Sequence, residues 1–169
     1  EMEGAKTIAR FFNIMGHDSE WVTNNVEKFG SAITALGNNS ATTEEEIAYM
    51  ATNLAAAANT VGLTDQEVLG LATTLSSLGL SAERGGSAMS TIMRKIETDV
   101  GTVSKKSSER LAAWGELIGM TGEQFRQAWG ADTVGTLHKI VQAMNQTEDV
   151  GESLYAVLND VGISNIRHS

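Results

Sequence analysis

A four-residue phrase that recurs four times is the feature that most constrains how this chain folds. Each copy has an apolar residue, a glycine, a second apolar residue and then serine or threonine, and the copies are Val61-Gly62-Leu63-Thr64, Leu78-Gly79-Leu80-Ser81, Ile118-Gly119-Met120-Thr121 and Val161-Gly162-Ile163-Ser164. Glycine reaches the left-handed conformation that ends a helix, and the hydroxyl then accepts hydrogen bonds from the first amides of the next helix. The phrase therefore predicts places where one helix ends and another begins.

The composition permits a globular domain without covalent or metal staples. With 169 residues, 41% of them apolar, the chain can bury roughly two thirds of its unfolded surface. It has no cysteine, which excludes disulfides, thiolate zinc sites and cysteine nucleophiles, and no proline, which suits helices. No apolar stretch approaches the roughly 20 residues of a membrane span, so we expect no membrane-spanning helix. Because the chain begins at Glu1 and its last residues show no terminal feature, we expect a helical domain over 1–169 cut from a longer chain.

Apolar residues follow the spacing of one helical face in nearly every segment, and no segment alternates as a strand would. The predicted class is all-α, a compact bundle of about eight to nine short helices joined by tight Gly-x-Ser/Thr turns. The stripes that support it are Ile8–Met15, Val22–Leu36, Ile47–Val61, Val68–Leu75, Met89–Val103, Leu111–Ile118, Phe125–Trp129, Leu137–Met144 and Leu154–Val161.

Two copies of the phrase are followed by residues that complete the capping motif of a helix N-terminus. Thr64 with Glu67, and Thr121 with Gln124, have the spacing of a capping box, and apolar residues flank both as a hydrophobic staple. A polar stretch over 101–108 predicts a break or hinge, and with it a soft subdomain boundary.

The copy at Gly79 departs from this pattern, because Gly85 and Gly86 lie where a staple partner is expected. Each glycine inside a helix costs about 1 kcal/mol relative to alanine, so the pair suggests that another backbone comes close. The neighbour could be a helix of this chain or of another subunit, and the first is the favoured interpretation.

The net charge of −9 is unevenly distributed: residues 1–79 carry −7, residues 80–110 carry +2 and residues 111–169 carry −4. The basic side chains of the middle segment are interrupted by Glu97, Asp99 and Glu109, so we interpret them as a solvated helix face and expect no nucleic-acid binding. These basic residues are Arg84, Arg94, Lys95, Lys105, Lys106 and Arg110.

Residues that could carry catalysis or hold a metal are scarce. His17, His138 and His168 have no second ligand at helical spacing, and no phosphate-binding loop or nucleophile motif is present, so we expect no metal and no cofactor. Glu116, between Trp114 and Leu117, is the one carboxylate in apolar company that could serve as a lysozyme-like acid, although a surface glutamate is the favoured interpretation.

The run Leu78-Gly79-Leu80-Ser81-Ala82-Glu83-Arg84-Gly85-Gly86-Ser87-Ala88-Met89 resembles the signature segment of phage tail tape measure proteins. In that family a helix ends in a leucine-glycine phrase and the next begins with Ser-x-Glu and a Gly-[ST]-Ala step. Further residues fall in the order that the family shows, so the resemblance covers nearly the whole chain: Ala9-Arg10-Phe11, Ala35 to Asn39 and Ala41 to Glu44 upstream, and Trp114, Gly119 to Thr121, Glu123 to Phe125, Trp129 and Asp132 downstream. The turn at Ala131 to Gly135 departs from it.

The resemblance implies a structural, non-enzymatic domain. Tape measure proteins are long helical chains around which the tail tube polymerises, so that chain length sets tail length, and they are expelled when DNA is delivered. Implied partners are the tail tube protein, tail assembly chaperones and tail tip or baseplate proteins. Assembly of the chain into a homo-oligomer in the virion is a further possibility. The implied locations are the virion tail and, during assembly, the host bacterial cytoplasm. The candidate signature or packing residues are Gly79, Ser81, Glu83, Arg84, Gly85, Gly86 and Ala88.

Two other functions are open at this point. One is a cell-wall-degrading module of a phage tail, with Glu116 as its acid. The other is a helical nucleic-acid-binding domain built on the tight turn at Gly79, against which the net charge of −9 counts.

Overall fold

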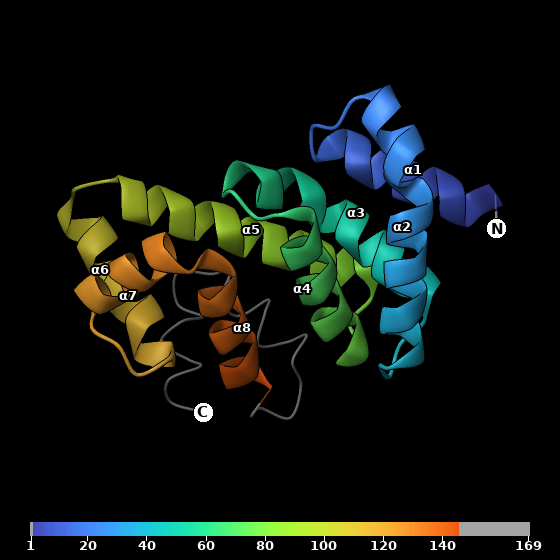
Figure 1. Cartoon of the computed structure of the whole chain (residues 1–169). Helices are drawn as coiled ribbons and strands as arrows, with labels where there is room; N and C mark the ends of the chain where they lie inside the picture. The colour runs from blue at the N-terminus through green and yellow to red at the C-terminus, as the bar shows by residue number, and fades with distance from the viewer. Residues whose placement is uncertain (1, 146–169) are drawn as a thin grey trace. The chain divides into compact units, whose positions relative to one another are not determined.

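Helix ends in this protein are set by local signals along the chain. The computed structural model describes residues 2–145, and in that range it contains helices and no strand (Figure 1). The helices are α1 (Met2–Ile14), α2 (Ser19–Asn38), α3 (Glu44–Thr60), α4 (Asp65–Ser77), α5 (Ala82–Gly101), α6 (Lys105–Leu117), α7 (Gly122–Ala131) and α8 (Thr133–Met144). The all-α prediction is confirmed; the expected helix over Leu154–Val161 and the phrase at Gly162 lie outside the described residues.

Glycine turns join successive helices as the recurring phrase predicts. Gly62, Gly79 and Gly119 have φ angles of 85°, 87° and 74°. In each turn the residue after the glycine donates its N–H to the carbonyl five residues earlier; Leu63 to Ala58 (2.9 Å) is one example. Gly16 (φ 94°) makes the same turn between α1 and α2, which the phrase missed because His17 follows it instead of an apolar residue.

Both predicted capping boxes are formed. The Thr64 hydroxyl accepts from Glu67 N (3.1 Å) while the Glu67 carboxylate accepts from Thr64 N (2.8 Å). Thr121 and Gln124 exchange the same two bonds at 3.1 and 2.9 Å. Each box satisfies amides that the first helical turn leaves without partners, so α4 and α7 have fixed starting points.

The chain divides into two units, with the boundary inside α5 between Ser90 and Thr91. In the first unit α3 packs against α1, α2 and α4. Alanines 48, 51, 55, 57 and 58 of α3 are all buried, and their small side chains permit this close packing. Aromatic side chains of α1 and α2 pack together: the centroid of the Phe12 ring lies 5.0 Å from that of Trp21 and 4.5 Å from that of Phe29.

In the second unit α6 and α7 form a tight hairpin, and α8 packs on α7. A Cβ atom on Gly115 would lie 2.5 Å from the Met120 carbonyl oxygen, so only glycine fits there. The hairpin encloses three aromatic rings, with Phe125 6.5 Å from Trp114 and 6.4 Å from Trp129. These rings are at most 2% exposed and form the centre of this unit.

The polar stretch over 101–108 contains a helix break, as predicted. α5 ends at Gly101, and the Ser104 hydroxyl caps α6 by accepting from Ser107 N (3.1 Å). The role of this stretch as a hinge and subdomain boundary stays a prediction. Among the described residues, no helix is both long and apolar enough to cross a membrane.

Candidate functional site

The residues of the predicted signature lie in the α4–α5 turn and the first turns of α5. Gly79 ends α4, and the Ser81 hydroxyl accepts from Arg84 N (3.2 Å). The Ser81 carbonyl accepts from Gly85 N (2.8 Å), which is the first helical bond of α5. Gly79 and Ser81 therefore fix the angle at which the two helices meet.

The staple that seemed to be missing at this turn is present in another form. In a hydrophobic staple, the residue before the cap packs on the fourth helical residue, and here these are Leu80 and Gly85. A Cβ atom on Gly85 would lie 2.9 Å from Leu80 Cβ and 3.2 Å from Met50 Cε. Leu80 thus packs directly on the backbone of Gly85, and the missing side chain is what makes room for it.

Gly86 brings α5 against α3. A Cβ atom on Gly86 would lie 2.6 Å from Asn53 Cβ, closer than two such atoms approach. Polar bonds hold the crossing on either side: the Asn53 amide donates to the Ala82 carbonyl (3.1 Å), and the Ser90 hydroxyl donates to the Asn53 carbonyl (3.1 Å). The favoured interpretation of the glycine pair, a neighbouring helix of the same chain, is confirmed.

The signature residues divide between an inward and an outward face. Gly85, Gly86 and Ala88 are buried, whereas Glu83 and Arg84 are exposed together with the turn residues Gly79 and Ser81. Glu83 lies in the first turn of α5, where the positive end of the helix dipole favours a carboxylate. The buried glycines let the backbone of α5 pack closely on α3, which is a structural role.

Residues that the sequence offered for catalysis or metal binding are not gathered into a site. Glu116 is exposed and therefore lacks the apolar enclosure that would keep a catalytic acid protonated. His138 is half-buried, and His168 lies outside the described residues. Within residues 2–145, no group of three or more His, Asp or Glu side chains is placed to hold a metal ion.

His17 has a carboxylate partner that sequence spacing did not reveal. Its Nε2 lies 2.8 Å from Asp65 Oδ2, across 48 residues of sequence. Its ring stacks on Trp21 with centroids 3.5 Å apart and an interplanar angle of 8°. The pair ties the α1–α2 turn to the first residue of α4, and it depends on packing that no local motif encodes.

The interpretation of the middle segment as a solvated face is wrong for two residues. Arg94, Lys105 and Lys106 are exposed as expected, but Asp99 is only 2% exposed and accepts from Arg110 Nε at 2.7 Å. The α5–α6 turn folds α6 back so that Arg110 reaches Asp99. A buried carboxylate requires such a partner, because an isolated charge is costly to remove from water.

The last turn of α5 also receives two donors from α7. Trp129 Nε1 donates to the Glu97 carboxylate (2.9 Å), and Arg126 donates to the Val100 carbonyl. A cation at the end of a helix satisfies a carbonyl that has no helical partner and offsets the negative end of the dipole. Together with the Asp99–Arg110 pair, these bonds connect α6 and α7 to the last turn of α5.

Comparison with known proteins adds one finding. The family model described as phage-related minor tail protein matches residues 3–161, which is nearly the whole chain. No curated protein and no solved structure gives a significant match. Since the family match spans both units and includes the signature at the α4–α5 turn, the chain belongs to the family of phage-related minor tail proteins.

Proposed function

We propose that this chain is a structural domain of a phage or prophage tail tape measure protein, acting in tail assembly, in setting tail length and later in genome delivery. Membership in the minor tail protein family supports a structural role in the tail. The finer assignment is supported by the signature from Leu78 to Met89 and by the ordered residues on either side of it.

The observation that carries the proposal is the helix crossing at Gly85 and Gly86. The positions that resemble the tape measure signature are the same positions at which the contacts with Leu80 and Asn53 leave room only for glycine. The signature thus describes a way of packing α5 on α3. A helix packing that depends on glycine at these positions is consistent with a structural role.

The proposed partners follow from the proposed role. They are the tail tube protein, tail assembly chaperones and proteins of the tail tip or baseplate. The proposed location is the virion tail, after assembly in the host bacterial cytoplasm.

The proposal includes that this domain is not an enzyme. The exposure of Glu116 supports this, because cleavage of a glycan needs a carboxylic acid that is shielded from water opposite an ionised partner. Peptidoglycan zymography of the purified chain is expected to show no clearing. Clearing that disappears in Glu116→Gln would overturn this part of the proposal.

Genetic complementation tests the role in assembly. Disruption of the gene is expected to give filled heads without normal tails, and the wild-type gene supplied in trans should restore them. A copy with Gly86→Leu, which cannot form the crossing, should fail to restore tails, whereas Gly70→Ala, with no atom within 4 Å of the added carbon, should restore them. Normal tails in the disrupted phage would contradict the proposal.

A further inference from the structure

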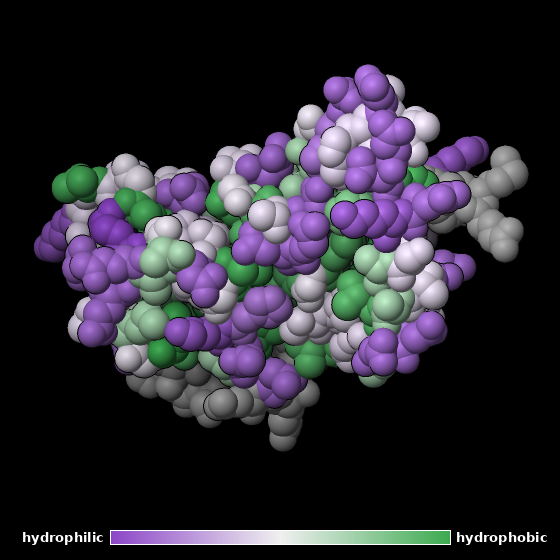
Figure 2. All heavy atoms as spheres, in the orientation of Figure 1, coloured by the Kyte–Doolittle hydropathy of each residue, from purple (hydrophilic) through white to green (hydrophobic). Residues whose placement is uncertain are grey.

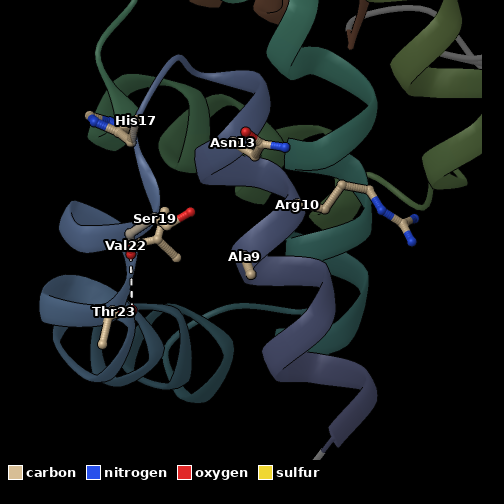
Figure 3. A pocket seen from close by; sticks show the side chains of 7 residues that line it. All are labelled: Ala9, Arg10, Asn13, His17, Ser19, Val22 and Thr23. Carbon is tan, nitrogen blue, oxygen red and sulfur yellow. Dashed lines mark hydrogen bonds between the residues drawn. The ribbon is translucent and has the colours of Figure 1, made fainter.

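A hollow of about 470 Å³ lies between α1 and α2 in the first unit (Figure 3). The residues that line it come from α1, from the turn that follows it and from the start of α2: Ala9, Arg10, Asn13, His17, Ser19, Val22 and Thr23. Ala9 and Val22 supply apolar surface, and the others supply polar groups. None of these residues takes part in the α4–α5 turn or in the crossing of α5 on α3, so this surface is separate from the site described above.

The wall of the hollow at the α1–α2 turn is held in place. His17 is fixed on one side by Asp65 at 2.8 Å and on the other by the Trp21 ring. The Asp18 carboxylate caps α2 by accepting from Trp21 N at 2.8 Å. The hollow is therefore formed before any ligand arrives, which lowers the entropy cost of binding.

Three side chains on this surface carry hydrogen-bond donors that have no acceptor among the described residues. The side chains of Arg10, Asn13 and Ser19 make no hydrogen bond or ion pair within the described part of the chain. In Figure 3 the Ser19 hydroxyl is directed from α2 toward α1, whereas the Arg10 side chain extends from α1 on the side away from Ser19, with Asn13 one turn further along α1. Donors in this arrangement suit an occupant that presents acceptors, above all carboxylates.

The charge around the hollow differs from that of the surrounding segment. Residues 1–79 carry −7 and contain only three basic residues, Lys6, Arg10 and Lys28. Lys6 and Arg10 are exposed and lie one helical turn apart on the same face of α1. Two of the three cations thus form a short row beside the hollow, on a hairpin whose visible surface is mostly hydrophilic (Figure 2).

We infer that the α1–α2 hollow is a docking surface for a partner protein helix that carries two carboxylates one turn apart. One carboxylate pairs with Arg10 and the next with Lys6, while Asn13 and Ser19 donate to further acceptors of the same helix. Ala9 leaves room for the partner's side chains between α1 and α2. The Asp18 and Asp65 carboxylates already have partners within the chain and do not compete for these donors.

The test uses the full chain labelled with ¹⁵N and a blocked helical peptide with two glutamates one turn apart. Its counterpart, with glutamine at both positions, is the control peptide. The glutamate peptide should shift the amide signals of Arg10, Asn13 and Ser19, and its affinity should fall as salt is raised. The glutamine peptide should bind about tenfold more weakly.

Matched variants decide whether the hollow itself is responsible. Arg10→Glu should weaken binding of the glutamate peptide about tenfold or more. Lys28→Glu makes the same change of charge at an exposed position of α2 outside the hollow and should leave the affinity within about twofold. Ala9→Leu, which fills the hollow and leaves the charges in place, should also weaken binding, and circular dichroism checks that each variant is folded. Equal effects of Arg10→Glu and Lys28→Glu, equal binding of the two peptides, or no binding of either would overturn the inference.

Discussion

Arg110 Nε donates to Asp99 Oδ1 at 2.7 Å, and this bond joins the Asp99 side chain, which is 3% exposed, to the Arg110 side chain, which is 40% exposed. The two residues are eleven positions apart on either side of the α5–α6 turn. Arg110 also donates to the hydroxyl of the fully buried Ser107. The turn that the sequence marks as a break is thus closed by a partly buried ion pair.

Removing the cation of this pair should destabilise the second unit. Arg110→Ala leaves the Asp99 carboxylate buried without its partner, and we expect a loss of about 2 kcal/mol in the free energy of unfolding, below the full cost of breaking a buried pair because water reaches Arg110. Lys106→Ala removes an exposed cation from the same helix and should change it by under about 0.5 kcal/mol. Urea denaturation followed by circular dichroism measures both. Equal stability of the two variants would show that the pair has no such role.

The close approach of α5 to α3 predicts opposite signs for two glycine substitutions. In Gly86→Ala the added carbon would meet Asn53 Cβ at 2.6 Å, so the helices must separate, at a cost of about 1–3 kcal/mol. In Gly70→Ala, inside α4, nothing lies within 4 Å, and the gain in helix propensity should stabilise the chain by about 0.5–1 kcal/mol. Thermal unfolding should shift downward for the first and upward for the second. A downward shift of the same size in both would contradict the packing described at Gly86.

The capping boxes should contribute measurably to stability. Thr64→Ala removes the acceptor for Glu67 N, and Thr121→Ala removes the acceptor for Gln124 N, so each should cost about 1 kcal/mol. Thr60→Ala, at an exposed threonine near the end of α3 whose hydroxyl bonds only its own helix, is the control and should have little effect. Chemical denaturation of the three variants checks this. A cost at Thr60 as large as at the two caps would argue against a special role for the boxes.

Two buried tryptophans should respond differently to replacement by phenylalanine. The indole N–H of Trp129 donates to Glu97, whereas that of Trp114 has no acceptor among the described residues. Both changes remove a similar buried volume, but only Trp129→Phe also removes a hydrogen bond to a charged group, so it should cost about 1 kcal/mol more than Trp114→Phe. Equilibrium unfolding of the two variants measures the difference. A larger loss for Trp114→Phe would indicate that its N–H has a partner in the folded protein.

Helix ends were predictable because their signals are local. Gly62, Gly79 and Gly119 adopt the left-handed conformation where the phrase predicts it, and Thr64 and Thr121 cap the helices that follow. Gly16 was missed because the residue after it, His17, is polar, although its backbone makes the same bonds. Backbone geometry at a turn depends on a few neighbouring residues, and most of these can be recognised in the sequence.

Contacts between distant residues were not predictable in the same way. The pairing of His17 with Asp65 spans 48 residues and requires the α1–α2 turn to lie at the start of α4. The reach of Arg110 to Asp99 depends on the direction in which α6 leaves its turn. At the α4–α5 turn the glycine pair did predict a close backbone neighbour, but only the structure identifies Leu80 and Asn53 as the reason.

The length of the phage tail tests the proposed tape measure role most directly. An extended helix rises about 1.5 Å per residue, so removing this domain in frame would shorten the tail by up to roughly 250 Å if the segment is fully extended, and by less if it stays folded. An in-frame duplication should lengthen the tail by a corresponding amount, and electron microscopy of purified virions measures both. Tails that shorten with the deletion and lengthen with the duplication are the predicted result; tails of wild-type length in both phages would contradict the role.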